Sequence, residues 1–111
     1  MSRNFLSNNG ELHKGDSLVS NNGAFKAVFQ EDGNFVVYGW KPVWASHTNG
    51  SPAFRLVMQS DCNLVIYDKG GKPLWDARSK RPNPGICRLQ LTDQGELVVS
   101  SGAERVWPLI L

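Results

Sequence analysis

The sequence contains little cysteine: Cys62 and Cys87 are the only two among its 111 residues. Two cysteines are too few for a four-ligand zinc site, and both histidines, His13 and His47, lie far from them in the sequence. The pair can form one disulfide bond, which would close a loop of about 25 residues and add roughly 3 kcal/mol of stability. Two buried free thiols are the alternative that these residues leave open. We expect neither a metal nor a cofactor.

The chain also lacks a strong charge of one sign. Its 12 basic and 10 acidic side chains give a net charge of +2, without a block of lysine or arginine. This balance gives no electrostatic case for binding nucleic acid. The densest basic stretch, Arg78-Ser79-Lys80-Arg81, precedes Pro82, Pro84 and Gly85 and is interpreted as a solvated loop.

Long hydrophobic runs are missing as well. No segment approaches the roughly 18 apolar residues that a membrane-spanning helix needs, so no membrane insertion is expected. No apolar run follows Arg3, so the N-terminus does not read as a signal peptide. The chain could be a mature form, be exported by another route or be intracellular.

Signatures of catalysis are absent. The sequence has no nucleophile elbow, no HExxH motif and no paired-carboxylate pattern, so we do not expect an enzyme. Asp32-Gly33-Asn34 resembles the start of a calcium loop, but the remaining ligands do not follow.

What the chain does have is a threefold internal repeat. The three matching segments are Phe29–Tyr38, Met58–Tyr67 and Leu91–Ser100, and each is followed by a tryptophan: Trp44, Trp75 and Trp107. A unit of about 30 residues cannot bury its own apolar face, but three units around a common axis can, with the tryptophans as central core residues. We therefore expect one domain, residues 1–111, built as a pseudo-threefold bundle of small sheets.

Each repeat predicts strands and turns. Apolar and polar residues alternate, and Gly, Asn, Asp and Pro punctuate the runs. The first motif reads as a hairpin of Ala27–Gln30 and Asn34–Tyr38 around Asp32-Gly33, with a single long strand as the alternative. Trp40 falls outside the repeat and reads as a surface aromatic.

The polar residues of each motif are predicted to share one face. At strand spacing, Asn34, Val36 and Tyr38 point outward while Phe35 and Val37 face the core, and Gln30 and Asp32 approach across the turn. The second repeat has the same set: Gln59, Asp61, Asn63, Val65 and Tyr67. Amides, a carboxylate, a phenol and a small apolar contact match the hydroxyls and C–H patch of a pyranose sugar.

The pattern Gln-x-Asp-x-Asn-x-Val-x-Tyr, the three repeats and the tryptophans resemble the bulb-type (monocot-type, B-type) mannose-binding lectins over nearly the whole chain. The resemblance implies an all-β, β-prism II fold with three four-stranded antiparallel subdomains around a pseudo-threefold axis. It also implies a mannose-specific lectin that needs no metal. By resemblance, Cys62 and Cys87 match a disulfide that joins the turn of one motif to the start of the following repeat.

The resemblance also assigns roles to matching residues. In the first site, Asp32 and Asn34 would bond the axial 2-hydroxyl of mannose, Gln30 the 3-hydroxyl and Tyr38 the 4-hydroxyl, with Val36 against the ring. Asp61, Asn63, Gln59, Tyr67 and Val65 would act alike in the second site. The third repeat keeps only Val98, because Thr92, Gln94, Glu96 and Ser100 replace the polar residues. We therefore predict two intact sugar sites and a third, structural repeat.

Further expectations follow from the same resemblance. Two sites per chain would cross-link mannose-rich glycans in recognition or defence, and the apolar tail Pro108–Leu111 favours a homodimer. Some members occur in fish skin mucus without an ordinary signal peptide, which favours an extracellular location here. Asn49-Gly50-Ser51 is a glycosylation sequon if the chain is secreted. The alternative is a toxin-like or inhibitory protein-interaction module with Trp40, Phe54 and the 78–81 loop as its surface.

Overall fold

The computed structural model describes residues 3–108 and contains only strands and turns within that range. The twelve strands are β1 (Phe5–Ser7), β2 (Gly10–His13), β3 (Ser17–Val19), β4 (Lys26–Phe29), β5 (Phe35–Tyr38), β6 (Pro42–Ala45), β7 (Ala53–Met58), β8 (Leu64–Asp68), β9 (Pro73–Asp76), β10 (Cys87–Leu91), β11 (Leu97–Ser101) and β12 (Glu104–Trp107). This part of the chain offers no helix capable of crossing a membrane.

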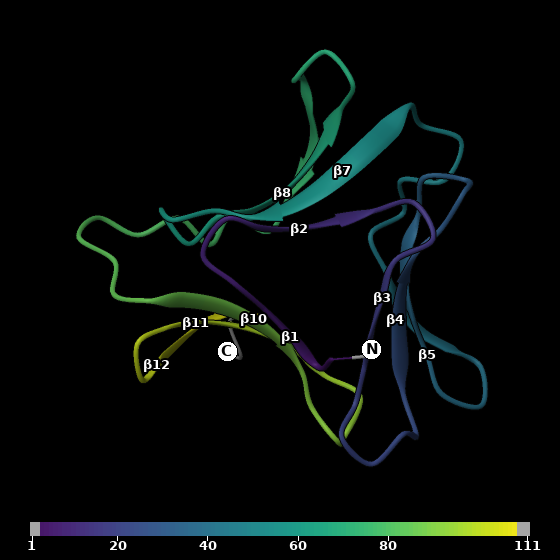
Figure 1. The fold of residues 1–111 in the computed structure, drawn as a ribbon, viewed down its shortest axis with the longest axis horizontal. Helices are drawn as coiled ribbons and strands as arrows, with labels where there is room; N and C mark the ends of the chain where they lie inside the picture. The colour runs from purple at the N-terminus through teal and green to yellow at the C-terminus, as the bar shows by residue number, and fades with distance from the viewer. Residues whose placement is uncertain (1–2, 109–111) are drawn as a thin grey trace.

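The strands form three four-stranded antiparallel sheets. Their strand orders are β3-β4-β5-β6, β2-β7-β8-β9 and β1-β10-β11-β12. Viewed down the short axis, the sheets lie as the three sides of a triangle (Figure 1). The prediction of three four-stranded antiparallel sheets is confirmed, and so is the hairpin at the first motif, because Phe29 pairs with Phe35 across its turn.

Each repeat supplies three consecutive strands of one sheet, and the N-terminal segment supplies the fourth strand of all three. β1, β2 and β3 pair with β10, β7 and β4, respectively. Each of these short strands buries one leucine: Leu6, Leu12 or Leu18. The sequence did not predict this role, because strands of three or four residues are too short to show a period.

The core lies between the three sheets. Its side chains come from alternate positions of the strands, such as Phe35 and Val37 of β5 and Leu64 and Ile66 of β8, which are all fully buried. Burial of each such side chain contributes roughly 1.5–3 kcal/mol. The predicted inward set of the first two motifs is therefore confirmed.

The three repeat tryptophans pack on one another. The ring centroids of Trp44 and Trp75 lie 5.9 Å apart, those of Trp44 and Trp107 5.7 Å apart, and those of Trp75 and Trp107 6.2 Å apart. All three pairs meet edge to face, the arrangement that the aromatic quadrupole favours. Because each tryptophan comes from a different sheet and packs against the core, the triad joins the three repeats, as their spacing predicts.

Candidate functional site

The first motif surrounds the turn between β4 and β5. Gly33 has a φ of 89°, and a Cβ there would lie 2.9 Å from the Ser51 carbonyl oxygen. The positive φ favours glycine, and the close approach of Ser51 leaves no room for a side chain. The turn brings Gln30, at the end of the first strand, next to the polar residues that follow it.

A connected hydrogen-bond network holds the polar side chains of this motif. Gln30 Nε2 donates to Asp32 Oδ1 at 3.1 Å, and the Tyr38 hydroxyl donates to Gln30 Oε1. The Asn34 backbone N–H donates to Asp32 Oδ1 at 2.9 Å. The Asn34 N–H and then the Gln30 amide hold the pKa of Asp32 below its ordinary value of 3.8, so its carboxylate is ionised at neutral pH.

Ser46 and Thr48 orient the side chain of Asn34 through hydrogen bonds. Its Oδ1 accepts hydrogen bonds from the Thr48 N–H and the Ser46 hydroxyl, both at 3.2 Å. The Thr48 hydroxyl also donates to the Gly33 carbonyl at 2.6 Å. With Oδ1 occupied, the amide Nδ2 points away, and no acceptor within residues 3–108 bonds to it. The site therefore presents a free double donor beside a carboxylate.

The valines of the motifs are less accessible than the outward face predicts. Val36 and Val65 are each only 3% exposed. Val36 lies on the outer face, but Val28 and Ala45 flank it in register on the neighbouring strands. Each valine therefore shares the outward face of its strand but is almost fully covered by its neighbours.

The second motif reproduces the network of the first. Gln59 Nε2 donates to Asp61 Oδ1 at 3.1 Å, the Asn63 N–H donates to Asp61 Oδ1 at 2.9 Å, and the Tyr67 hydroxyl donates to Gln59 Oε1. Cys62 takes the place of Gly33, with a φ of 72°. The structure thus brings together both predicted sets of polar side chains, one set on each of two sheets.

The second motif differs from the first at the side-chain amide of its asparagine. Asn63 Nδ2 donates to Asp76 Oδ2 at 3.0 Å, whereas the matching position beside the first motif is Ala45. One of the two amide protons is therefore already bonded, and a second carboxylate lies at the site.

Sequence reasoning missed the residues that support the two asparagines. Ser79 is fully buried: its hydroxyl donates to the Cys62 carbonyl at 2.6 Å, and its N–H donates to Asn63 Oδ1 at 3.1 Å. The interpretation of residues 78–81 as a solvated loop is therefore wrong at Ser79, although Arg78 and Lys80 are exposed. The spacing in the sequence could have identified these residues, because Thr48 and Ser79 each lie four residues after a repeat tryptophan.

The disulfide between Cys62 and Cys87 is present. It joins the β7–β8 turn to the first residue of β10, and the two Cα atoms lie 5.1 Å apart. This bond ties the turn of the second motif to the third sheet, as the resemblance implied, and the alternative of two free thiols is wrong.

The third motif keeps the turn and loses the polar cluster. Gly95 has a φ of 83°, and the Thr92 hydroxyl accepts the N–H groups of Gln94 at 3.3 Å and Glu96 at 3.1 Å, so it replaces the aspartate as the turn acceptor. Glu96 pairs with Arg105 at 3.1 Å. No side chain here presents the free carboxylate-and-amide pair of the first motif.

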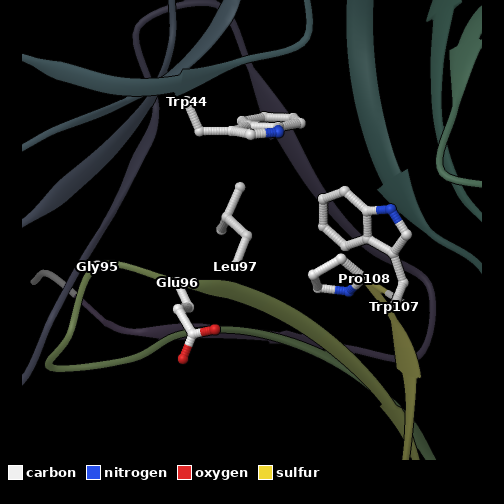
Figure 2. A pocket seen from close by; sticks show the side chains of 6 residues that line it. All are labelled: Trp44, Gly95, Glu96, Leu97, Trp107 and Pro108. Atoms are coloured by element: carbon white, nitrogen blue, oxygen red, sulfur yellow. The ribbon is translucent and has the colours of Figure 1, made fainter. Parts of the chain in front are cut away.

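A cavity of about 250 Å³ lies beside the tryptophan triad. Figure 2 shows Leu97 pointing toward Trp44, with Trp107 and Pro108 on the other wall and Glu96 at the rim. None of the ten motif residues of the first two repeats lines it. Within residues 3–108, no group of three or more His, Cys, Asp or Glu residues could hold a metal ion.

Comparison with known proteins decides the family. No protein-family model matches the chain. The B-type lectin plumieribetin of Scorpaena plumieri is 56% identical to this chain over 104 residues, which cover 94% of this chain and 92% of that protein. The chain belongs to the B-type lectin family.

Solved lectin structures share the fold. The Marasmius oreades lectin superposes with a TM-score of 0.86 at 27% identity, covering 95% of this chain and 88% of that one. The mannose-specific agglutinin from snowdrop (Galanthus nivalis) bulbs, complexed with methyl-α-D-mannoside, superposes with a TM-score of 0.78 at 35% identity, covering 88% and 89%. This B-type lectin therefore has the predicted β-prism II fold, and its relatives are carbohydrate-binding proteins and not enzymes.

Proposed function

We propose that this B-type lectin binds mannose at two sites per chain, one at each intact motif. The observation that carries the proposal is the repeated network in which a tyrosine bonds a glutamine and the glutamine bonds an aspartate, whose carboxylate also accepts the backbone N–H of the asparagine. A sugar hydroxyl both donates and accepts, so it can bond the carboxylate and the asparagine amide together.

Specific roles follow for the ten motif residues. Asp32 and Asn34 in the first site, and Asp61 and Asn63 in the second, would take the axial 2-hydroxyl. Gln30 and Gln59 would take the 3-hydroxyl, and Tyr38 and Tyr67 the 4-hydroxyl. Val36 and Val65 would form the floor under the ring. The snowdrop agglutinin and the Polygonatum cyrtonema lectin, both solved with mannosides, support mannose as the ligand.

One shallow site of this kind should bind a monosaccharide near millimolar, which corresponds to about −4 kcal/mol. Useful affinity then comes from several sites engaging a branched mannose-rich glycan, where multivalency can add about 10²–10⁴-fold. A homodimer with four sites would serve this purpose. The tail that suggested a dimer includes Leu109–Leu111, which lie outside the described residues.

The decisive test is the double variant Asp32→Ala with Asp61→Ala. We expect it to lose binding to immobilised mannan while its circular dichroism and tryptophan fluorescence stay unchanged, since both aspartates are at the surface turns. Glu31→Ala is the matched control, because it removes an exposed neighbouring carboxylate outside the network and should leave binding intact. Full mannan binding by the double variant would disprove the site assignment.

Binding should not depend on a metal ion, because hydrogen-bonding side chains alone make up each proposed site. Binding to mannan after dialysis against EDTA should equal binding in the presence of calcium. A loss of binding with EDTA that calcium restores would contradict the proposal.

A second candidate function is a toxin-like or inhibitory interaction with a protein partner. The observation that favours it is Trp40, a fully exposed tryptophan in the β5–β6 turn, with half-exposed Val43 on β6 nearby in sequence. Trp40→Ala would impair an activity that depends on protein contact, whereas Tyr38→Phe would impair one that depends on sugar. Competition by free methyl-α-D-mannoside separates the two functions.

We further propose that the lectin acts outside the cell, as recognition of mannose-rich glycans in defence requires. The fish relative is in keeping with this location. The sequon residue Asn49 is exposed, and its neighbour Gly50 donates a backbone hydrogen bond of 2.8 Å to the Asp32 carbonyl. A glycan on Asn49 would therefore stand beside the first site, and mass spectrometry of the secreted protein would detect it.

A further inference from the structure

The outer face of the third sheet carries a hollow beside the position of the lost motif tyrosine. It measures about 400 Å³ and is lined by Ile86, Arg88, Gln90, Ser100 and Gly102. Ser100 occupies the position of the motif tyrosine, so a small hydroxyl side chain stands where Tyr38 and Tyr67 place a phenol ring in the other two sheets. A serine at this position leaves room that a phenol ring would fill.

A cation flanks this position in all three sheets. Lys26 lies opposite Tyr38, Arg55 opposite Tyr67, and Arg88 opposite Ser100 in the strand registers. The two arginines are held in different ways. Arg55 pairs with Glu11 at 3.1 Å and its guanidinium centre lies 5.1 Å from the centroid of the Tyr67 ring, so its charge is already compensated.

Arg88 lacks the acidic partner. In the second sheet, Glu11 of the N-terminal strand β2 lies opposite Val57 of β7. In the third sheet, Phe5 of the N-terminal strand β1 occupies the matching position, opposite Gln90 of β10. The guanidinium centre of Arg88 lies 4.7 Å from the centroid of the Phe5 ring. Arg88 takes part in none of the ion pairs found within residues 3–108. An aromatic ring therefore positions this arginine and leaves its charge for a ligand.

The other lining groups suit an anionic sugar. The Ser100 hydroxyl and the Gln90 amide can donate hydrogen bonds to an oxyanion that Arg88 binds in bidentate fashion. Ile86, at the edge of the hollow, is 69% exposed and offers an apolar contact to sugar C–H groups. A bare inorganic anion would leave that contact unused.

We propose that this hollow is a third carbohydrate site, which binds a sugar bearing an oxyanion, either a carboxylate or a sulfate ester. Arg88 supplies the charge, Ser100 and Gln90 supply the neutral donors, and Ile86 contacts the ring. The site is separate from the two mannose motifs and does not depend on them.

The experiment is an NMR titration of the full chain, following the backbone amides of Ser100 and Gly102. The ligands are methyl β-D-glucuronide, glucose 6-sulfate, the neutral methyl β-D-glucoside and inorganic sulfate. We expect shifts at these amides with at least one of the two anionic sugars, weakened by 0.5 M NaCl because the ion pair is exposed. The first two ligands distinguish a carboxylate from a sulfate ester.

The variant Arg88→Gln should reduce affinity for the responding sugar at least about fivefold. Lys41→Gln is the matched control, because it removes one positive charge from an exposed turn of another sheet and should change nothing. The double variant Asp32→Ala with Asp61→Ala should keep this binding, so failure of the mannose proposal would be seen separately.

Three results would overturn the proposal. The first is an equal response to the neutral glucoside, which would remove the role of the charge. The second is an equal response to inorganic sulfate alone, which would remove the role of the sugar. The third is unchanged binding in Arg88→Gln.

Discussion

The side-chain amide of Asn63 donates a hydrogen bond of 3.0 Å to the carboxylate of Asp76, and the two motif sites differ because of it. In the first site, Ala45 stands at the matching position, and no acceptor among the described residues 3–108 bonds the amide protons of Asn34. A ligand at the second site must share the amide with Asp76 or displace it. The two proposed sugar sites thus share a sequence motif but differ in the hydrogen-bond donors that their asparagine amides offer to a ligand.

The first prediction concerns this difference. In a background of Asp32→Ala, which isolates the second site, Asp76→Ala should bind methyl-α-D-mannoside about two- to tenfold more tightly, because one hydrogen-bond donor becomes free. Isothermal titration calorimetry measures the change. In the reverse exchange, Ala45→Asp in a background of Asp61→Ala should weaken the first site. Weaker binding after Asp76→Ala would mean that Asp76 itself holds the ligand.

The second prediction concerns the buried hydroxyl behind the second site. Ser79→Ala removes the bonds of the Ser79 hydroxyl to the Cys62 carbonyl and the Leu64 N–H. Leaving these buried groups unsatisfied should cost about 1–3 kcal/mol of unfolding free energy, measured by urea denaturation. Mannoside affinity should fall at the second site alone. An exposed control, Ser60→Ala, should preserve stability, and equal losses at both sites would argue against a local role.

The third prediction concerns the disulfide and the turn that it holds. Replacing both cysteines, Cys62→Ala with Cys87→Ala, should lower the unfolding free energy by about 3 kcal/mol, because the closed loop constrains the unfolded chain. Cys62 also has a positive φ of 72°, which alanine adopts poorly. Cys62→Gly with Cys87→Ala should therefore recover about 1 kcal/mol of that loss. Guanidinium denaturation compares the two, and no recovery would show that the turn is held by other contacts.

The fourth prediction concerns pH. The N–H of Asn34 and the amide of Gln30 favour the charged carboxylate, so the pKa of Asp32 in the folded chain lies below 3.8. A depressed pKa gives stability that is present above the unfolded value and is lost as pH falls through the folded one. Because the proposed contact to the sugar hydroxyl uses the ionised carboxylate, mannoside binding to the first site, isolated by Asp61→Ala, should stay constant from neutral pH to about 4 and decline only below that.

NMR titration of the Asp32 carboxyl carbon tests the cause directly. Gln30→Ala should raise its pKa toward the ordinary value, whereas Gln90→Ala, on another sheet, should not change it. An Asp32 carboxyl that titrates normally in the intact chain would contradict the network.

The sequence by itself determined the architecture at the level of the repeat. Alternation along Phe35–Tyr38 separates a core face from a polar face, because successive strand side chains point to opposite sides. The regular spacing of Trp44, Trp75 and Trp107 predicts a shared centre, because one repeat is too small to bury its own apolar face. The polar motif is intact in the first two repeats and degenerate in the third, which distinguishes the first two sheets from the third. All of these signals are periodic, so they can be read without coordinates.

Only the tertiary structure decided what lies beside and behind each motif. The short strands around Leu6 and Leu12 complete two of the sheets by pairing with strands far away in the chain, and no local pattern marks them. Asp76 and Ser79 reach the second site because β9 and the segment after it fold back on its turn. Within the described part of the chain, Arg88 has no acidic partner of the kind that Arg55 has, because Phe5 on the N-terminal strand of the third sheet stands where the second sheet has Glu11. Local alternation sets which way a side chain points, whereas the three-dimensional pairing of distant strands sets which partner it meets.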